Sequence, residues 1–369
     1  MIIESLELKN FRNYRELSLQ LSPGTNLLYG PNAQGKTNVL EALFYCASAR
    51  SHRGSKDREM IRFEESEAHI RLQLLKREVP YRVDIHLKKD RTKGIAINGV
   101  PIRRASELFG TVNAVLFSPE DLNLIKNGPS DRRRFMDLEL CQMNRTYVQV
   151  LVQYNQALQQ RNRLLKDLYF RPELVDTLDL WDDQLVRFGR ELIRFRRRFV
   201  EELNPVISEL QGKIAGGTEP LQVFYDASTD EDQFPEMLAR SRETDEKLKL
   251  TSVGPHRDDL GFLIDRPEAG KRGMDLRKYG SQGQQRTAAL ALKLSEIALM
   301  KRHLGESPVL LLDDVLSELD ENRQKQLLSA IEGVQTVITS TGMEHILKQE
   351  FSVDRIFEVQ DGTIRRCQL

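Results

Sequence analysis

The residues with the clearest chemistry form a short glycine-rich turn, "GPNAQGKT", at positions 30–37. A glycine, four spacers and Gly-Lys-Thr match G-x-x-x-x-G-K-[ST], a pattern that cradles phosphate groups. Gly30 and Gly35 let the backbone curl so that successive N–H groups point inward, and a helix beginning near Lys36 adds its positive end. Lys36 supplies a cation for the β- and γ-phosphates, and the Thr37 hydroxyl can ligate Mg²⁺. The turn therefore predicts a nucleoside triphosphate site whose members are Gly30, Pro31, Asn32, Ala33, Gln34, Gly35, Lys36, Thr37 and Asn38.

A second stretch, "VLLLDD" (309–314), provides the carboxylates that such a site needs. Apolar residues running into two aspartates are typical of a buried parallel strand that ends at a ligand-binding edge. Asp313 would hold Mg²⁺, and Asp314 could reach the attacking water as a general base. A strand capped by an Asx turn is the alternative, but the phosphate turn favours the metal carboxylate. ATP and Mg²⁺ are the predicted cofactors.

The stretch "YGSQGQQR" (279–286) precedes a long helical pattern. Ser281 is a good N-cap residue, so these residues can serve only to begin that helix. The alternative is a second helix N-terminus aimed at phosphate. Because the helix that begins near Lys36 already provides one such N-terminus, the second N-terminus would contact the nucleotide of another subunit. The spacing by itself leaves both interpretations open.

The elements around these motifs change character along the chain. Alternating patterns predict strands within residues 1–29 and 68–102, with Asn98-Gly99 as a hairpin turn, and an apolar run predicts one more strand within 113–122. The segment from 130 to about 212 is polar and helical, with one helical arm on each side of Pro172. From residue 251 the pattern alternates between strands and helices. We interpret residues 130–250 as an insertion that splits the β-rich part of the chain.

The composition of the chain limits the classes of function that it can have. The chain has 369 residues with 55 basic and 55 acidic side chains, so a nucleic-acid surface would have to be a local basic patch. Basic clusters at 49–58, 87–94, 131–135 and 194–199 are candidates. The last two lie in the helical insertion, where nearby glutamates allow a solvated, ion-paired helix face instead. Three widely spaced cysteines argue against a disulfide framework or a zinc site. The charged start and the lack of a long apolar run predict a cytoplasmic protein with no membrane partner.

The order of these motifs resembles the ABC-type ATPases of DNA maintenance, which include SMC and Rad50 proteins, and most closely the RecF family of bacterial recombination mediators. The resemblance implies an α/β fold: an ABC-type P-loop ATPase lobe of mixed β-sheets with helices, formed by residues 1–128 and 251–369. A mainly helical insertion lobe, residues 129–250, would split it. The segments that carry the resemblance are "LKNFRNY" (8–14), "GPNAQGKTNVLEAL" (30–43), "LFSPEDLNLIKNGPSDRRRFMD" (116–137), "TSVGPHRDDL" (251–260), "YGSQGQQR" (279–286) and "LLLDDVLSELD" (310–320).

The resemblance also implies roles for single residues. Ser281, Gly283 and Gln284 are similar to the signature motif, which contacts the γ-phosphate bound by a partner subunit. Residues 317–320 are similar to the D-loop at the dimer seam. Arg12 falls where the family places nucleotide contacts near the first strands. Nucleotide binding would therefore involve residues outside the phosphate turn.

Lys36, Asp314 and Ser281 would then be the catalytic residues. Two departures from the wider superfamily stand out. Asp314 occupies a position where most ABC proteins have Glu, and a shorter base implies slow hydrolysis. Where many relatives carry a Q-loop glutamine and a switch histidine, this chain has "FSPED" and "ITSTG", so Glu120 and Thr339 are open candidates for those roles.

The resemblance implies a weak, DNA-stimulated ATPase that acts as an ATP-timed clamp in recombinational repair, replication restart and the SOS response. Two copies would sandwich ATP and bind single-stranded or gapped DNA, with RecR and RecO as partners. One alternative is a nucleotide-gated scaffold, in which ATP binding alone drives dimerisation and partner loading. Another is a P-loop kinase acting on a small molecule, which would work as a monomer.

Overall fold

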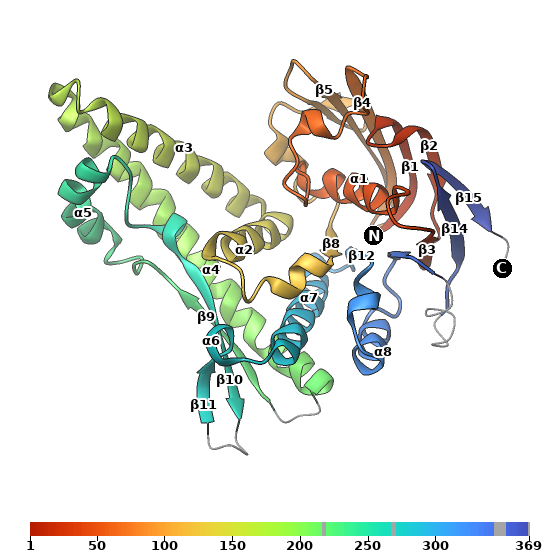
Figure 1. The fold of residues 1–369 in the computed structure, drawn as a ribbon. Helices are drawn as coiled ribbons and strands as arrows, with labels where there is room; N and C mark the ends of the chain where they lie inside the picture. The colour runs from red at the N-terminus through yellow and green to blue at the C-terminus, as the bar shows by residue number, and fades with distance from the viewer. Residues whose placement is uncertain (216–218, 267–270, 343–351, 368–369) are drawn as a thin grey trace. The chain divides into compact units, whose positions relative to one another are not determined.

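The computed structural model describes residues 1–215, 219–266, 271–342 and 352–367 (Figure 1). They form two compact units, one made of Met1–Asn123 with Ala289–Leu369, the other of Leu124–Ala288. The sequence interpretation placed the divisions after residues 128 and 250. The second unit continues past residue 250 because strand β10 (Asp259–Arg266) pairs with β9 (Leu221–Asp226). Among the described helices, none has both the length and the apolar character needed to cross a membrane.

The first unit contains an antiparallel sheet in the order β2-β1-β4-β5-β6-β7. Alternate residues of its long strands are buried, as the period-two pattern predicted, so that one face packs inward and the other is polar. Asn98 and Gly99 both have positive φ and close the last hairpin, which confirms the turn that the sequence indicated. The strands are β1 (Ile2–Phe11), β2 (Tyr14–Gln20), β4 (Glu67–Lys76), β5 (Val79–Lys88), β6 (Gly94–Ile97) and β7 (Val100–Pro101).

The same unit contains a second six-stranded sheet in the order β15-β14-β3-β13-β12-β8. All neighbours run parallel except β14 and β15. Every residue of β8 and β12 is buried, because strands of a parallel sheet are covered on both faces. The strands are β3 (Thr25–Tyr29), β8 (Ala114–Phe117), β12 (Val309–Asp313), β13 (Thr336–Ser340), β14 (Arg355–Gln360) and β15 (Thr363–Cys367).

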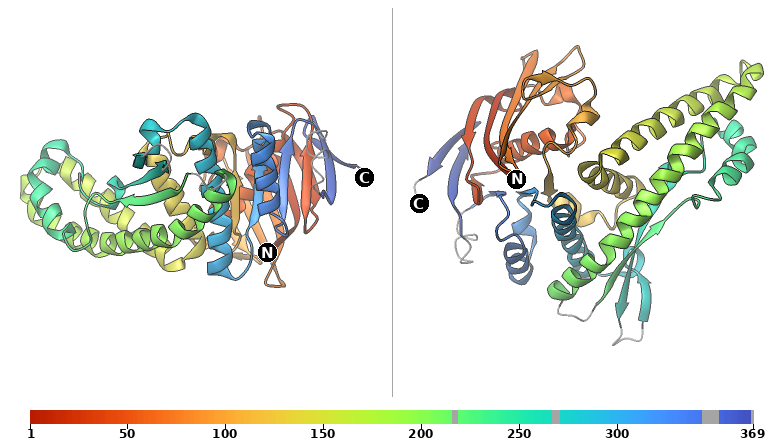
Figure 2. Two further views of the ribbon diagram at one scale, coloured as in Figure 1. Left: turned by 90° about the horizontal axis from the view of Figure 1, so that it is seen from below. Right: turned by 180° about the vertical axis from the view of Figure 1, so that it is seen from behind.

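Helix α1 (Lys36–Ser48) contacts strands of both sheets, β4 in the antiparallel one and β8, β12 and β13 in the parallel one. Figure 2 shows this unit from two further sides. Nearly every residue of α1 is buried, which explains why "VLEALFYCAS" is apolar on almost all sides. Helix α8 (Glu321–Ala330) connects β12 to β13, so the C-terminal ends of β3, β13 and β12 meet at one edge of the sheet.

The second unit is a helical assembly with a small sheet in the order β11-β10-β9, where β11 is Lys271–Asp275. Helices α3 and α4 pack against each other, α4 also packs on β9, and α2 packs on β10. Its helices are α2 (Pro129–Met143), α3 (Arg145–Asp167), α4 (Leu178–Ala215), α5 (Phe234–Leu248) and α6 (Leu276–Tyr279). Helix α7 (Gln282–Leu304) begins in this unit and ends in the first.

One helical prediction needs correction. The sequence suggested a single first arm from residue 132 to 168, but Asn144 adopts an extended conformation that ends α2. Its side-chain oxygen accepts hydrogen bonds from the N–H groups of Thr146 and Tyr147 and so caps α3. The arm is therefore two helices, because an asparagine side chain satisfies the N–H groups that a continuous helix would have used.

Candidate nucleotide-binding site

The phosphate turn follows β3 and leads directly into α1, as the motif requires. Gly30 and Gly35 have φ values of 153° and 114°, in the region that favours glycine. A Cβ at Gly30 would collide with the carbonyl oxygen of Val359, and one at Gly35 would collide with the Asn13 side chain. Both positions therefore require glycine for two independent reasons, backbone conformation and space.

Lys36 is held inside the turn that it closes. Its Nζ donates hydrogen bonds to the carbonyl oxygens of Gly30 (2.6 Å) and Pro31 (2.7 Å), and the residue is 6% exposed. Burial lowers the pKa of Lys36, while the nearby carboxylates of Asp314 and Asp313 oppose that shift. The ammonium group is thus held at the turn by two backbone carbonyl oxygens.

The ends of β12 and β13 bring the predicted carboxylates to this turn. Thr37 Oγ1 donates a hydrogen bond to Asp313 Oδ1 (2.8 Å), and Thr339 Oγ1 donates another to the same oxygen (2.9 Å). The Thr339 hydroxyl in turn accepts from the backbone N–H of Asp314 (2.9 Å). Thr339 lies between the two motifs because β13 lies between β3 and β12. Glu120, the other open candidate, is an exposed residue of the short helix Pro119–Asn123.

Asp314 has an unusual backbone conformation and a shifted pKa. Its φ of 52° is left-handed, and its carbonyl oxygen accepts from Ser317 Oγ (2.7 Å). Burial raises the pKa of Asp314, Lys36 lowers it, and the neighbouring Asp313 carboxylate raises it further. The net rise makes Asp314 a better proton acceptor than an ordinary aspartate, which suits a general base.

These groups line one cavity of about 430 Å³. Of its lining residues, only Arg53 belongs to neither of the two motifs nor to β13. Arg53 is an exposed residue of the loop after α1. The sequence showed it only as part of a basic cluster, and nothing in the spacing tied it to the phosphate turn. The described lining consists of Asn32, Ala33, Gly35, Lys36, Thr37, Asn38, Arg53, Asp313, Asp314 and Thr339.

Three of the predicted turn residues are absent from the described lining and contribute hydrogen bonds beside it. Gly30 and Pro31 hold Lys36 by their carbonyl groups, and Gln34 Oε1 accepts from the N–H of Asp361 (2.6 Å). Arg12 is absent from the described lining. Its guanidinium forms a paired contact with the buried Glu41 carboxylate of α1, at 2.8 Å for each hydrogen bond.

Ser281, Gly283 and Gln284 belong to the second unit, at the start of α7. Ser281 Oγ accepts from the Gln284 N–H (3.2 Å), and Gln284 Oε1 accepts from the Ser281 N–H (2.9 Å). This reciprocal pair is a capping box, so the simpler of the two sequence interpretations describes the local structure. Ser281 itself is exposed. In the first unit, Asp320 of the D-loop-like segment caps α8 by accepting from the Arg323 N–H (3.0 Å).

The basic clusters of the second unit are mostly paired. Arg132 is 1% exposed and binds Asp259, and Arg196 is 2% exposed and binds Asp137 and Asp258. The exposed arginines of the 194–199 cluster pair with acidic neighbours: Arg194 with Glu191, Arg197 with Asp230 and Glu231, and Arg198 with Glu202. These contacts correspond to the solvated, ion-paired face that the sequence left as an alternative.

Known proteins are similar to this chain along nearly its whole length. Residues 2–365 match a family model described as the RecF/RecN/SMC N terminal domain. The DNA replication and repair protein RecF of Lachnoclostridium phytofermentans is 55% identical over 366 residues, which cover 99% of this chain and 100% of that protein. RecF of Agathobacter rectalis is 54% identical, with 99% of each chain covered.

Among solved structures, that of the recombination mediator protein RecF with ATP in the RecFOR pathway has a TM-score of 0.91 and 35% identity, covering 100% of this chain and 98% of the other. An Smc head domain with an extended coiled coil from Pyrococcus furiosus has a TM-score of 0.57 at 18% identity, a likeness of fold alone. The predicted α/β ABC-type ATPase fold with a helical insertion is confirmed. Given the family match along the whole chain, the protein belongs to the RecF family of DNA replication and repair proteins.

Proposed function

We propose that this chain binds ATP with Mg²⁺ in the cavity at residues 30–38 and uses it to control a DNA-bound dimer in recombinational repair. The observation that carries the proposal is the convergence of Lys36, Thr37, Asp313 and Asp314 on one cavity. The solved RecF structures with ATP and with an ATP analogue support the choice of nucleotide, because they cover nearly all of this chain at about one-third identity.

The donor set at the end of β12 fits Mg²⁺. Thr37 Oγ1 and Asp313 Oδ1 are oxygen ligands only 2.8 Å apart, and Mg²⁺ prefers hard oxygen ligands. When bound, Mg²⁺ would neutralise charge on the β- and γ-phosphates. Lys36 would exchange its two carbonyl partners for phosphate oxygens. Asp314 would accept the proton of the attacking water.

The dimer part of the proposal concerns the start of α7. Ser281 is exposed, and Ser281, Gly283 and Gln284 would contact the γ-phosphate held by Lys36 of a second copy, completing that copy's site. Hydrolysis would be slow, because Asp314 is a shorter base than glutamate, and DNA would stimulate it. The dimer would then close on DNA with ATP and reopen after hydrolysis.

The cellular role rests on the relatives. They are named DNA replication and repair proteins, and the solved RecF structures are placed in the RecFOR pathway. We infer that this chain acts with RecR and RecO on single-stranded or gapped DNA. Replication restart and the SOS response are the processes in which such a clamp would be used.

A nucleotide-gated scaffold is the second candidate. In that case ATP binding alone would drive dimerisation and partner loading, and turnover would be irrelevant. The short general base at position 314 favours this candidate to the extent that hydrolysis is very slow. The two functions differ in whether blocking hydrolysis changes the lifetime of the complex on DNA.

The test is sedimentation of the purified chain with and without ATP, with and without gapped DNA, across a series of salt concentrations. We expect a monomer without nucleotide, an ATP-dependent dimer, and DNA binding that weakens steeply with salt because phosphate contacts dominate it. Lys36→Ala should abolish the ATP-dependent dimer. A Lys36→Ala variant that dimerises normally with ATP would refute the sandwich, and tight ATP binding by a permanent monomer would favour a kinase-like enzyme.

A further inference from the structure

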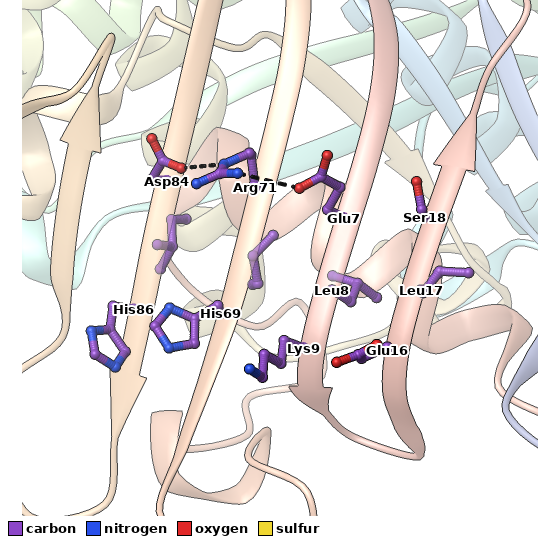
Figure 3. A pocket seen from close by; sticks show the side chains of 12 residues that line it. Glu7, Leu8, Lys9, Glu16, Leu17, Ser18, His69, Arg71, Asp84 and His86 are labelled. Carbon is purple, nitrogen blue, oxygen red and sulfur yellow. Dashed lines mark hydrogen bonds and ion pairs between the residues drawn. The ribbon is translucent and has the colours of Figure 1, made fainter.

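The polar face of the antiparallel sheet carries a group of metal-ligating side chains that the nucleotide site does not use. His69 on β4 and His86 on β5 are direct cross-strand partners, and Glu67 lies two residues before His69 on the same strand face. Residues that face each other on neighbouring strands have side chains close enough to interact. Figure 3 shows the two rings side by side on this face. The sheet thus brings His86 beside two donors of the preceding strand.

The geometry of the three side chains is close to that of a metal site. Glu67 Oε2 lies 2.8 Å from His86 Nε2, and Glu67 Oε1 lies 3.7 Å from His69 Nε2. One ligand atom from each residue lies within 4.8 Å of the other two. A tetrahedral zinc site with ordinary bond lengths needs ligand atoms roughly 3.3 Å apart. The two carboxylate–imidazole distances, one from each Glu67 oxygen, lie on either side of that value.

The stacking of the two rings suits metal binding. The imidazole rings are stacked with centroids 3.9 Å apart, so two positive charges on them would repel each other. The stacking therefore favours neutral imidazoles, the form that ligates metals.

We propose that Glu67, His69 and His86 form a binding site for one divalent transition-metal ion of the Zn²⁺ class. Two imidazoles and a carboxylate are a ligand set that zinc uses when a fourth position stays open to water or to another molecule. Here that position is accessible, because the side chains of Glu67, His69 and His86 are 46%, 45% and 32% exposed. The same exposure lets the rings rotate to make the three atoms converge.

The surroundings of the site carry charges of both signs, with Lys9 opposite His69 and Lys88 opposite Glu67 on the neighbouring strands. The two histidines also line a hollow of about 740 Å³ on this sheet face, together with Glu7, Glu16 and Asp84. Arg71 is already occupied by hydrogen bonds to Asp84 (2.7 Å) and Glu7 (3.4 Å), which keep its charge beside those carboxylates (Figure 3). The site uses none of the cysteines, whose spacing argues against a cysteine-based zinc site. The sequence contains no motif for it, because the pairing of β4 with β5 brings the ligands together.

The test uses the full chain, stripped of metal and held in excess Mg²⁺, which prefers oxygen ligands and occupies any site at Thr37 and Asp313. Zn²⁺ is titrated by calorimetry, and Co²⁺ is added as a spectroscopic probe of coordination. We expect one equivalent to bind, with visible Co²⁺ absorption of a four- or five-coordinate site. His69→Gln and His86→Gln should each weaken binding by at least about 10-fold.

Glu16→Gln is the matched control, because it removes a carboxylate from the same sheet face without touching the cluster, and it should bind as the original chain does. All four proteins should show the same thermal unfolding in chelator, since the changed side chains are on the polar face. The proposal is overturned if Zn²⁺ does not bind, if both histidine variants bind it as tightly as Glu16→Gln, or if the Co²⁺ spectrum shows a thiolate charge-transfer band, which would place the metal on a cysteine.

Discussion

Thr37 and Asp313 are 276 residues apart in the sequence, yet the Thr37 hydroxyl donates a hydrogen bond of 2.8 Å to the Asp313 carboxylate. One residue begins the helix after the phosphate turn, and the other ends the buried strand β12. Strand β13 lies between β3 and β12 and adds the hydroxyl of Thr339 to the same carboxylate oxygen. The pair therefore exists only when the parallel sheet is assembled.

The first prediction follows from this pair. Thr37→Ala removes a hydroxyl that would ligate Mg²⁺, so Mg²⁺-dependent ATP affinity should fall about 10- to 100-fold. Affinity without Mg²⁺ should change much less. The measurement is titration with a fluorescent ATP analogue with and without Mg²⁺. Thr37→Ser keeps the hydroxyl and is the control; equal losses in the Ser and Ala variants would show that the methyl group, not the hydroxyl, matters.

The second prediction concerns the proposed general base. Asp314→Asn keeps the size of the side chain but cannot take a proton, so ATP hydrolysis should fall about 100- to 10,000-fold while ATP binding is retained. Phosphate release in a single turnover measures the chemistry, and sedimentation measures the dimer. A timed clamp should then stay on DNA, whereas a scaffold should load its partners unchanged.

Glu318→Gln serves as the control for Asp314. Glu318 raises the pKa of Asp314 through its charge but leaves the base itself in place. Because residue 318 belongs to the D-loop-like segment, turnover is compared per ATP-dependent dimer, and we expect it to be near normal in this variant. If Glu318→Gln loses as much activity as Asp314→Asn, the local charge and not the position of the carboxylate determines the rate.

The third prediction tests the start of α7. Ser281→Arg places a long, charged side chain at an exposed position, so it should block the ATP-dependent dimer and leave ATP binding to the monomer intact. Analytical ultracentrifugation and nucleotide titration separate the two effects. Ser281→Thr, which retains a capping hydroxyl, should dimerise. Normal dimerisation of the Arg variant would mean that residues 281–284 serve only as a helix cap.

The fourth prediction concerns pH and the second unit. His256 Nε2 contacts the carbonyl oxygen of Thr251 (2.9 Å), so it carries the hydrogen, and Nδ1 accepts from the Tyr154 hydroxyl (2.7 Å). Burial lowers the pKa of His256 from 6.5 to about 4. The unfolded chain therefore binds more protons between pH 6.5 and 4, and the free energy of unfolding should decrease as the pH falls through that window.

The contribution of one such group is at most about 1.4 kcal/mol per pH unit. Urea unfolding followed at pH 7 and pH 5 measures it, with His256→Gln for comparison. The variant should be less stable than the original chain at pH 7 and should lose less stability on acidification. Parallel losses in the two proteins would assign the pH dependence to other groups.

The sequence predicts those parts of the fold that depend on local patterns of adjacent residues. The phosphate turn, the apolar strand before Asp313 and the Asn98–Gly99 hairpin each depend on a few adjacent residues whose backbone demands are specific. The existence and type of these three features can therefore be predicted without knowledge of the rest of the chain. Arg53 is different: it joins the cavity through a loop, and no local pattern records the distance to Lys36.

The buried arginines are the clearest example of a feature that cannot be predicted from the sequence. Arg132, Arg161 and Arg196 were indistinguishable from solvent-exposed basic residues, yet each is almost fully buried. Their partners come from distant segments: Asp259 for Arg132, Asp182 and Asp245 for Arg161. A buried charge requires such a partner, and only the tertiary structure reveals that one is present.

The order of strands in the parallel sheet has a consequence for biosynthesis. Both neighbours of β3, which are β13 and β14, come from the last part of the chain, and β8 pairs with β12 from that same part. During synthesis, β3 and β8 therefore emerge without a pairing partner among the described strands of the N-terminal segment. Their edges stay unpaired until more than 300 residues have been translated. The parallel sheet can close only after β12, β13 and β14 have been translated, so a nascent chain stalled after the helical unit would expose unpaired strands to chaperones.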